Sequence, residues 1–190
     1  MYTFNPTKTT IINLPFSGVL VDGFNRSHRL SEHLTFGEVY DATKVLNKEK
    51  LFNTGVPFPR NGIALFELLR SYTKKPLYLG SAHRSYEWEL FKKRSGTSEH
   101  LHTAIDFNGE GLNKLIKDAL HEKNELYYEL RSMGVNGFGE YSWGWHLDFR
   151  ENKPNDEIYF WSDKKKNSLT VVFVLIALFL IKKIFKNARY

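Results

Sequence analysis

The fold of this chain depends on the stretch Ser98-Glu99-His100-Leu101-His102-Thr103-Ala104-Ile105-Asp106-Phe107 and the later stretch Gly144-Trp145-His146-Leu147-Asp148-Phe149. Both combine histidine and carboxylate side chains with strand-forming residues. Two imidazoles and one carboxylate, with a fourth position left to water, are the ligands of a catalytic zinc site rather than of a closed structural one. The two stretches therefore predict a zinc hydrolase.

Spacing limits how these residues can meet. His146 and Asp148 are two apart, so in a strand they share one face, and one can bind a metal while the other orients it or handles a proton. His100 and Asp106 would be about 20 Å apart in a continuous strand, so the chain must turn between them. His102 lies four residues before Asp106, which suits one helical face, although the neighbouring residues favour strand. Both His100 and His102 remain candidate ligands.

Composition predicts one modest domain with an appendage. The chain has 190 residues, of which 42% are hydrophobic and 15% aromatic, enough for a single core. It contains no cysteine, which excludes disulfides and thiolate ligands. Any metal must therefore be bound by imidazole and carboxylate groups.

The net charge of +6 is concentrated near the C-terminus. Residues 164–190 contain seven Lys or Arg and no Asp or Glu. Without them, 20 basic residues face 21 acidic ones, a charge of −1. The body of the chain is thus not basic, and we expect no nucleic-acid partner.

The same C-terminal part contains an uncharged apolar run from Leu169 to Ile181. A helix from Ser168 to Phe185 would be about 27 Å long, slightly short of a hydrocarbon core, and Lys182 and Lys183 would extend outward to the headgroups. The run is apolar on every face and bracketed by lysines, which favours a membrane over a buried core helix. The sequence predicts a single-pass anchor in a lipid bilayer.

Periodicity predicts an α+β fold in which flanking helices surround a small antiparallel sheet that carries the metal ligands. We expect helices over 34–46, from Asn61 to Tyr72, over 86–93 and from Leu112 toward Gly134, and strands over 76–80, 135–141 and 145–150. The predicted organisation is an irregular arm (1–27), a zinc domain (28–150), a charged linker (151–167), a transmembrane anchor (168–186) and a basic tail (187–190).

The motifs, taken in order, resemble those of the zinc D-alanyl-D-alanine peptidases, a group related to lysostaphin-type endopeptidases and to the hedgehog signalling domain. The resemblance covers Leu30 to Arg150. It rests on Ser81-Ala82-His83-Arg84-Ser85, Ser98-Glu99-His100 through Asp106, Gly137-Phe138-Gly139-Glu140-Tyr141 and His146-Leu147-Asp148. Leu30 to Phe36 also resembles the entry segment of small phage-encoded members.

The resemblance implies zinc bound by His100, Asp106 and His146. It also implies that Arg84 binds a substrate carboxylate or carbonyl, for which its charged fork is suited. Ser98 matches a small residue that often stands beside the first ligand, and Asp148 matches the acid after the last ligand.

Three departures from the family pattern bear on these roles. The loop between the first histidine and the aspartate is one residue shorter than usual, which keeps His102 as an alternative to His100. Trp143 occupies the position where many members have an acidic general base, so the base would be Asp148 or Glu140. His83 replaces the usual aromatic residue and is a candidate for substrate contact, as is Trp143 beside the metal cluster.

The resemblance implies water-mediated hydrolysis of peptide bonds in bacterial peptidoglycan, as in the lytic enzymes (endolysins) of bacteriophages. A membrane-anchored enzyme of this kind would lie in the host envelope or in the internal membrane of a virion. One alternative is a D,D-carboxypeptidase that trims D-Ala termini. Another is a non-catalytic, hedgehog-like binding protein, which Trp143 in the position of the base keeps open.

Overall fold

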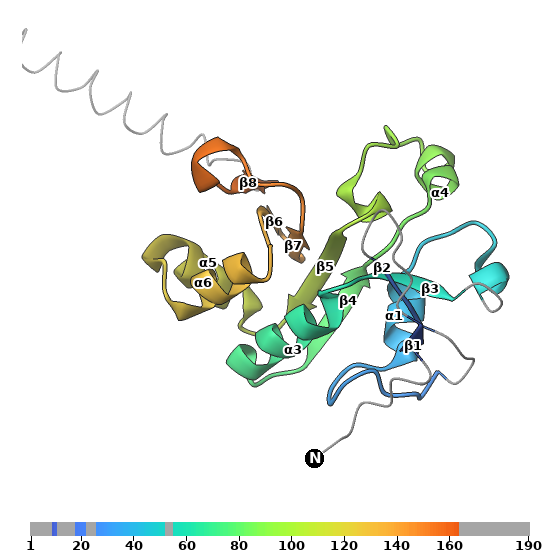
Figure 1. Ribbon diagram of the computed structural model, residues 1–190, viewed down its shortest axis with the longest axis horizontal. Helices are drawn as coiled ribbons and strands as arrows, with labels where there is room; N and C mark the ends of the chain where they lie inside the picture. Colours follow the sequence, from blue (N-terminus) through green and yellow to red (C-terminus); the bar gives the residue numbers. More distant parts are fainter. Residues whose placement is uncertain (1–8, 11–17, 22–25, 52–54, 164–190) are drawn as a thin grey trace, which may run out of the picture.

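The computed structural model describes residues 9–10, 18–21, 26–51 and 55–163 (Figure 1). Five strands form the main sheet, in the spatial order β4-β5-β7-β6-β8. Their bounds are β4 Leu77–Ser81, β5 Ala104–Gly109, β6 Gly137–Tyr141, β7 Gly144–Asp148 and β8 Tyr159–Ser162. A second sheet joins β1 Thr9–Thr10, β2 Gly18–Val21 and β3 Val56–Pro59 in that order. The α+β class is confirmed.

The main sheet is mixed, whereas the sequence predicted an antiparallel one. Strands β4, β5, β7 and β6 pair antiparallel, but β8 runs parallel to β6. The connection after β7 returns to the level at which β6 begins, and the Tyr159 amide donates to the Asn136 carbonyl there. Arg131 holds this connection through hydrogen bonds of 3.1 Å to the Asn152 side chain and the Asp156 carbonyl. The segment predicted as a linker therefore contributes an edge strand to the sheet.

The helices are α1 Phe36–Ala42, α3 Gly62–Thr73, α4 Tyr86–Phe91, α5 Leu112–Glu122 and α6 Glu125–Ser132, with short 3-10 turns η2 Lys48–Lys50, η3 Glu99–Leu101 and η4 Pro154–Asp156. Each predicted helix has a counterpart. The first ends earlier than predicted, because the chain after Ala42 is extended and the Lys44 amide donates to the His83 carbonyl. The last is two helices, since Lys123 adopts a left-handed conformation and Asn124 caps α6.

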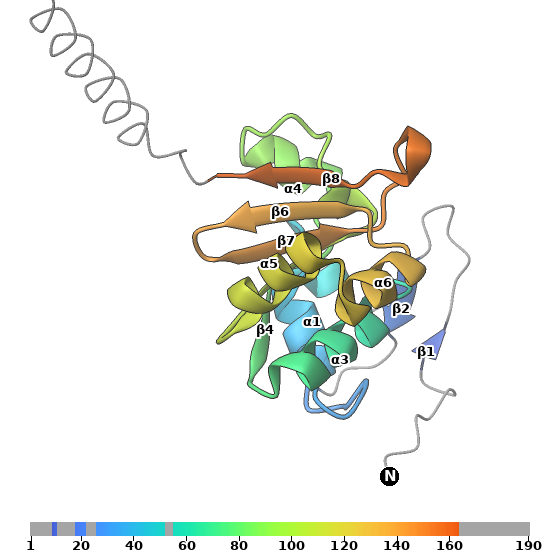
Figure 2. The same ribbon diagram turned by 90° about the vertical axis from the view of Figure 1, so that its left-hand side faces the viewer.

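Helices α3, α5 and α6 pack on one face of the main sheet (Figure 2). Every second residue of the strands points toward these helices and supplies the sheet side of this core. The Trp145 indole, one of them, donates to the Asn113 side chain at the start of α5. The buried side chains that the sheet contributes include Ile105, Phe107, Phe138, Trp145 and Leu147. The strand residues that alternate with these, which include Asp106, His146 and Asp148, therefore lie on the opposite face of the sheet.

Among the described residues, no helix has both the length and the apolar character needed to cross a membrane. The segment predicted as an anchor, 168–186, lies outside the described residues, as does the basic tail 187–190.

Candidate metal centre

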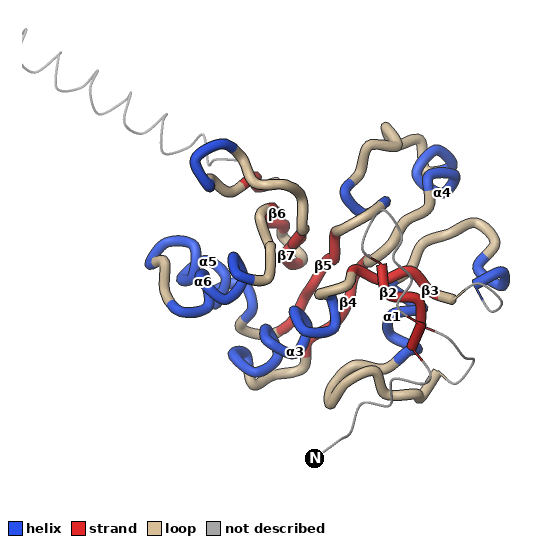
Figure 3. Tube along the Cα trace, in the orientation of Figure 1, coloured by secondary structure: helices blue, strands red, loops and turns tan. Residues whose placement is uncertain are grey.

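His100 is presented by a turn that precedes β5. The chain from α4 to β5 is a loop interrupted by η3 (Figure 3), and the Ser98 hydroxyl caps η3 by accepting from the His100 amide at 3.3 Å. This is the turn that the six-residue spacing to Asp106 required. The side chain of His100 is 2% exposed.

Asp106 and His146 lie directly opposite each other on the paired strands β5 and β7. Residues that pair across an antiparallel ladder project from the same face at close range. The sheet register therefore brings two ligands together from positions forty residues apart along the chain.

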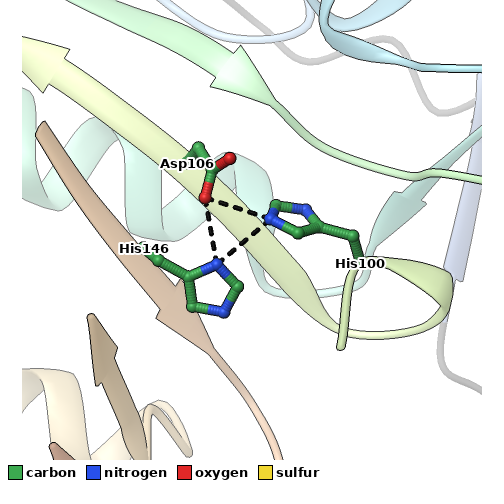
Figure 4. Close-up of side chains that lie close together, drawn as sticks. All are labelled: His100, Asp106 and His146. Atoms are coloured by element: carbon green, nitrogen blue, oxygen red, sulfur yellow. Dashed lines mark hydrogen bonds and ion pairs between the residues drawn. The ribbon is translucent and has the colours of Figure 1, made fainter. Parts of the chain in front are cut away.

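The three side chains form a tight triangle (Figure 4). Oδ1 of Asp106 lies 3.0 Å from Nε2 of His100 and 3.0 Å from Nδ1 of His146, and the two nitrogens are 3.1 Å apart. Two ligand atoms bonded at about 2.1 Å to a tetrahedral ion are about 3.4 Å apart, so the triangle is close to the size that a metal requires. All three residues are buried, and together they form a group that can hold a metal ion.

Hydrogen bonds outside the triangle fix which ring nitrogens carry protons. Nδ1 of His100 lies 2.7 Å from the Ala82 carbonyl oxygen, and Nε2 of His146 lies 3.1 Å from Oδ2 of Asp148. Each of these oxygens only accepts, so both nitrogens donate, and in the neutral rings the other nitrogens keep their lone pairs. Two nitrogen lone pairs and one carboxylate oxygen thus converge, an arrangement that suits a bound cation.

The pKa shifts describe the same group when protons, rather than a cation, lie between the rings and Asp106. Burial alone would raise the pKa of Asp106, but hydrogen bonds from His100 and His146 outweigh it and hold the pKa below its ordinary value. Burial lowers the pKa of His100, which keeps this ring neutral. Burial also acts to lower the pKa of His146, but hydrogen bonds to Asp106 and Asp148 outweigh it and raise this pKa. Protons and a metal would therefore compete for His146.

Asp148 lies behind His146, fully buried, and not in the cavity. Arg150 holds its carboxylate with two bonds, 2.7 Å from Nε to Oδ1 and 2.5 Å from Nη2 to Oδ2. A Cβ atom on Gly137 of the neighbouring strand would overlap both carboxylate oxygens, so only glycine leaves room for them. The geometry makes Asp148 the residue that orients His146, one of the two roles that the sequence left open, and does not support it as a base.

Glu140, the other predicted base, lies on the wrong face of the sheet. It pairs with Trp145, whereas its neighbour Gly139 pairs with His146, and strand side chains alternate between faces. Its carboxylate is 2.9 Å from Nζ of Lys117 on α5. This position does not support Glu140 as the base.

Arg84 is also held within the protein. Its Nη2 donates to Oδ2 of Asp106 at 3.0 Å, its Nε donates to the Ser81 hydroxyl at 2.9 Å, and its Nη1 lies 3.5 Å from Oε1 of Glu89. Burial is the largest influence on Arg84 and lowers its pKa. The guanidinium group lines the cavity, but its donors orient the Asp106 carboxylate.

A cavity of about 430 Å³ opens beside the triangle. Of the residues predicted to bind substrate, Arg84, Ser98 and Trp143 line it, whereas His83 does not. The Trp143 side chain is exposed and stacks on Tyr141, with ring centroids 5.0 Å apart and planes at 7°.

His102 is exposed and is not part of the buried group, so the structure brings His100, not His102, to Asp106 and His146.

Several cavity residues received no role from the sequence. Glu99 stands inside the quoted motif and, apart from Asp106, is the carboxylate among the described lining residues. Arg94 comes from the loop after α4, and Trp161 comes from β8. A Cβ atom on Gly139 would lie 2.5 Å from the Trp161 ring, so this glycine lets the indole cover the site next to His146. The sequence signal that could have identified Glu99 as a cavity residue was its position directly before His100.

No protein-family model, no curated protein and no solved structure matches this chain. The geometry by itself establishes a buried His-Asp-His group that can hold a metal ion, in an α+β fold.

Proposed function

We propose that this protein is a zinc-dependent peptidase that hydrolyses peptide bonds in bacterial peptidoglycan. The observation that carries the proposal is the triangle of His100, Asp106 and His146, whose metal-binding atoms lie within 3.1 Å of one another beside an open cavity. Three protein ligands with one side left open are typical of catalytic rather than structural zinc. The substrate class rests on the family resemblance.

A zinc ion held by these residues would polarise the scissile carbonyl and lower the pKa of a water molecule toward about 7. The protein must then supply a base for the water proton. Glu99 is the carboxylate at the cavity that does not belong to the metal-binding group. We assign it to accept the proton from the attacking water and to return it to the leaving amine.

The surroundings of Glu99 suit this assignment. Its side chain is 33% exposed, so water can reach it. The Thr103 hydroxyl donates to Oε2 at 3.3 Å, and Nη2 of Arg150 is 3.9 Å from Oε1. Because Glu99 directly precedes His100 in η3, the turn that presents the ligand also fixes the backbone of the base.

The test is digestion of purified peptidoglycan by the zinc-loaded protein, with mass spectrometry of the fragments and His146→Ala as the inactive control. Cleaved cross-links support the proposed peptidase. Loss of terminal D-alanine alone supports the D,D-carboxypeptidase. Intact peptidoglycan with one zinc bound per chain favours the hedgehog-like binding protein, and iron in place of zinc overturns the hydrolase.

The proposal includes attachment to a membrane through the uncharged segment from Leu169 to Ile181, as expected of an enzyme that acts at the envelope or from a virion membrane. Expression of the full chain, followed by alkaline extraction of membranes, tests this part. We expect the protein to stay in the membrane fraction and a variant without residues 164–190 to be released. Release of both would contradict the anchor.

A further inference from the structure

Three arginines line the cavity beside the His-Asp-His group, and two of them already have their donors engaged. Arg84 is bound to Ser81 and Asp106, as described above, and the Nε and Nη2 groups of Arg150 both donate to Asp148. A guanidinium group held in this way on a carboxylate has little capacity left for a ligand.

Arg94 differs from both. Among the described residues, its guanidinium group makes no hydrogen bond, and its one ion pair is a 3.6 Å contact with Glu89. The group lies over the Trp88 ring, 5.2 Å from its centroid, and the side chain is 47% exposed. Its backbone is fixed, because the Arg94 amide donates to the Glu89 carbonyl at 2.9 Å. A cation on an anchored backbone thus presents its donors to the cavity.

Arg94 also stands where two cavities meet. A second cavity, of about 270 Å³, lies next to the first, and the two share Arg84, Arg94, Asp106 and Trp143. The shared residues include a ligand of the proposed metal. A molecule that extends from one cavity into the other would therefore pass both the metal-binding group and Arg94.

The charges at this junction favour an anion. Glu89 is 1% exposed and lies between Arg84 and Arg94, so a single buried carboxylate serves two guanidinium groups. Asp106 balances the second positive charge only while it holds no metal. A bound divalent cation would leave the junction net positive, and a substrate carboxylate would compensate it.

We propose that Arg94 binds a carboxylate of the substrate at the junction of the two cavities, while Arg84 is a positioning residue for Asp106. This inference rests on the proposed function in taking the substrate to be a peptide. The carboxylate can belong to the C-terminus of the peptide or to an acidic side chain. The planar fork of Arg94 suits either source, because it can donate two parallel hydrogen bonds.

The experiment measures binding, so that it does not depend on turnover. One pair of probes is N-acetyl-D-alanyl-D-alanine and its C-terminal amide. The other is a C-terminally amidated peptide containing either D-glutamate or D-glutamine. Dissociation constants come from calorimetry with zinc-loaded and with metal-free protein. The variants are Arg94→Ala, Arg94→Lys and, as a matched control, Lys92→Ala, since Lys92 also lies over the Trp88 ring but lines neither cavity.

We expect the wild type to bind the carboxylate member of one pair at least about tenfold more tightly than its amide. The pair that shows the preference identifies the source of the carboxylate. Arg94→Ala should abolish the preference, Arg94→Lys should keep part of it, and Lys92→Ala should keep all of it. The preference should be larger with zinc bound than without it.

A preference that survives in Arg94→Ala overturns the inference, and so does the absence of any preference in the wild type. Hydrolysis of the same peptides is scored separately. An Arg94-dependent preference without hydrolysis would contradict the proposed function and support the inference. Hydrolysis with a preference that does not depend on Arg94 would support the proposed function and contradict the inference.

Discussion

Nε2 of His146 donates to Oδ2 of Asp148 at 3.1 Å, on the side of the ring that faces away from the metal-binding group. This bond leaves Nδ1 as the free ligand atom of His146. A side chain that the sequence offered as a base is, by its position, the support of a ligand.

Replacement of Asp148 should therefore lower metal affinity. Asp148→Asn keeps the shape of the side chain but removes the carboxylate that fixes the ring, and we expect zinc to bind about 10- to 100-fold more weakly. Competition with a fluorescent chelator measures the change. Glu140→Gln, on the opposite face of the sheet, is the control and should leave the affinity as it is. Unchanged affinity in Asp148→Asn, with turnover lost, would restore Asp148 as the base.

The two histidines before β5 should respond differently to substitution. His100→Ala removes a buried ligand atom and should abolish stoichiometric zinc binding, whereas His102→Ala removes an exposed ring outside the group and should retain it. Zinc content per chain after dialysis, measured by plasma mass spectrometry, distinguishes them. The reverse result would mean that the shortened loop places His102 at the metal.

Glu99→Gln tests the base directly. It should keep zinc bound, because Glu99 is not part of the metal-binding group, and lower kcat by about 10²- to 10⁴-fold. Steady-state hydrolysis of a soluble peptidoglycan fragment gives the rates, and Glu110→Gln on the exposed turn after β5 is a neutral comparison. A Glu99→Gln enzyme with wild-type kcat would show that another group moves the proton.

His83 should make stability fall in mild acid. Burial is the largest influence on His83 and lowers its pKa, and the charge of His102 lowers it further. A hydrogen bond with the Leu101 backbone acts in the opposite direction but is weaker, so the pKa falls from 6.5 to about 4. Above pH 6.5 both the folded and the unfolded chain leave His83 neutral. Between pH 6.5 and about 4 only the unfolded chain takes up the proton, so stability is lost as the pH falls, by roughly 3 kcal/mol in total.

Urea unfolding at a series of pH values, with a chelator present, measures this effect. His83→Asn should flatten the curve between pH 6.5 and 4 relative to the wild type. The same substitution at the exposed His121 is the comparison. If the wild type and His83→Asn keep parallel curves, His83 is protonated in the folded protein.

Substitution of Gly139 should disturb the wall of the cavity. Gly139→Ala places a methyl group against the Trp161 ring, and we expect a loss of about 1 to 3 kcal/mol of stability together with displacement of the indole. Thermal unfolding and tryptophan fluorescence report the two effects. At Gly80 a Cβ atom meets nothing closer than 3.4 Å, so Gly80→Ala should change both much less.

The residues of the His-Asp-His group were predictable because their signals are local. Imidazole and carboxylate side chains are rare in apolar strands, and the two-residue period of a strand is enough to put His146 and Asp148 on one face. The turn between His100 and Asp106 followed from distance alone. Helices at 62–73 and 86–91 were likewise visible in the apolar spacing.

The features that the sequence did not predict depend on interactions between distant segments of the chain. Whether Glu140 faces the site depends on the register of the β6–β7 hairpin, in which Tyr141 pairs with Gly144, and a shift of one residue would have reversed the answer. Trp161 was missed because β8 finds its place only by pairing with β6, about twenty residues earlier. Its four residues, three aromatics and a serine, do not reveal such a partner.

The parallel strand β8 has a practical consequence for anyone who shortens this protein. A truncated chain ending at Arg150, the natural choice from the sequence, would expose the backbone of β6 as a raw edge and strip the indole from above His146. Such a fragment invites aggregation and would be mistaken for an inert domain. A truncated chain that ends at Asp163 keeps β6 paired with β8 and keeps the Trp161 indole against His146.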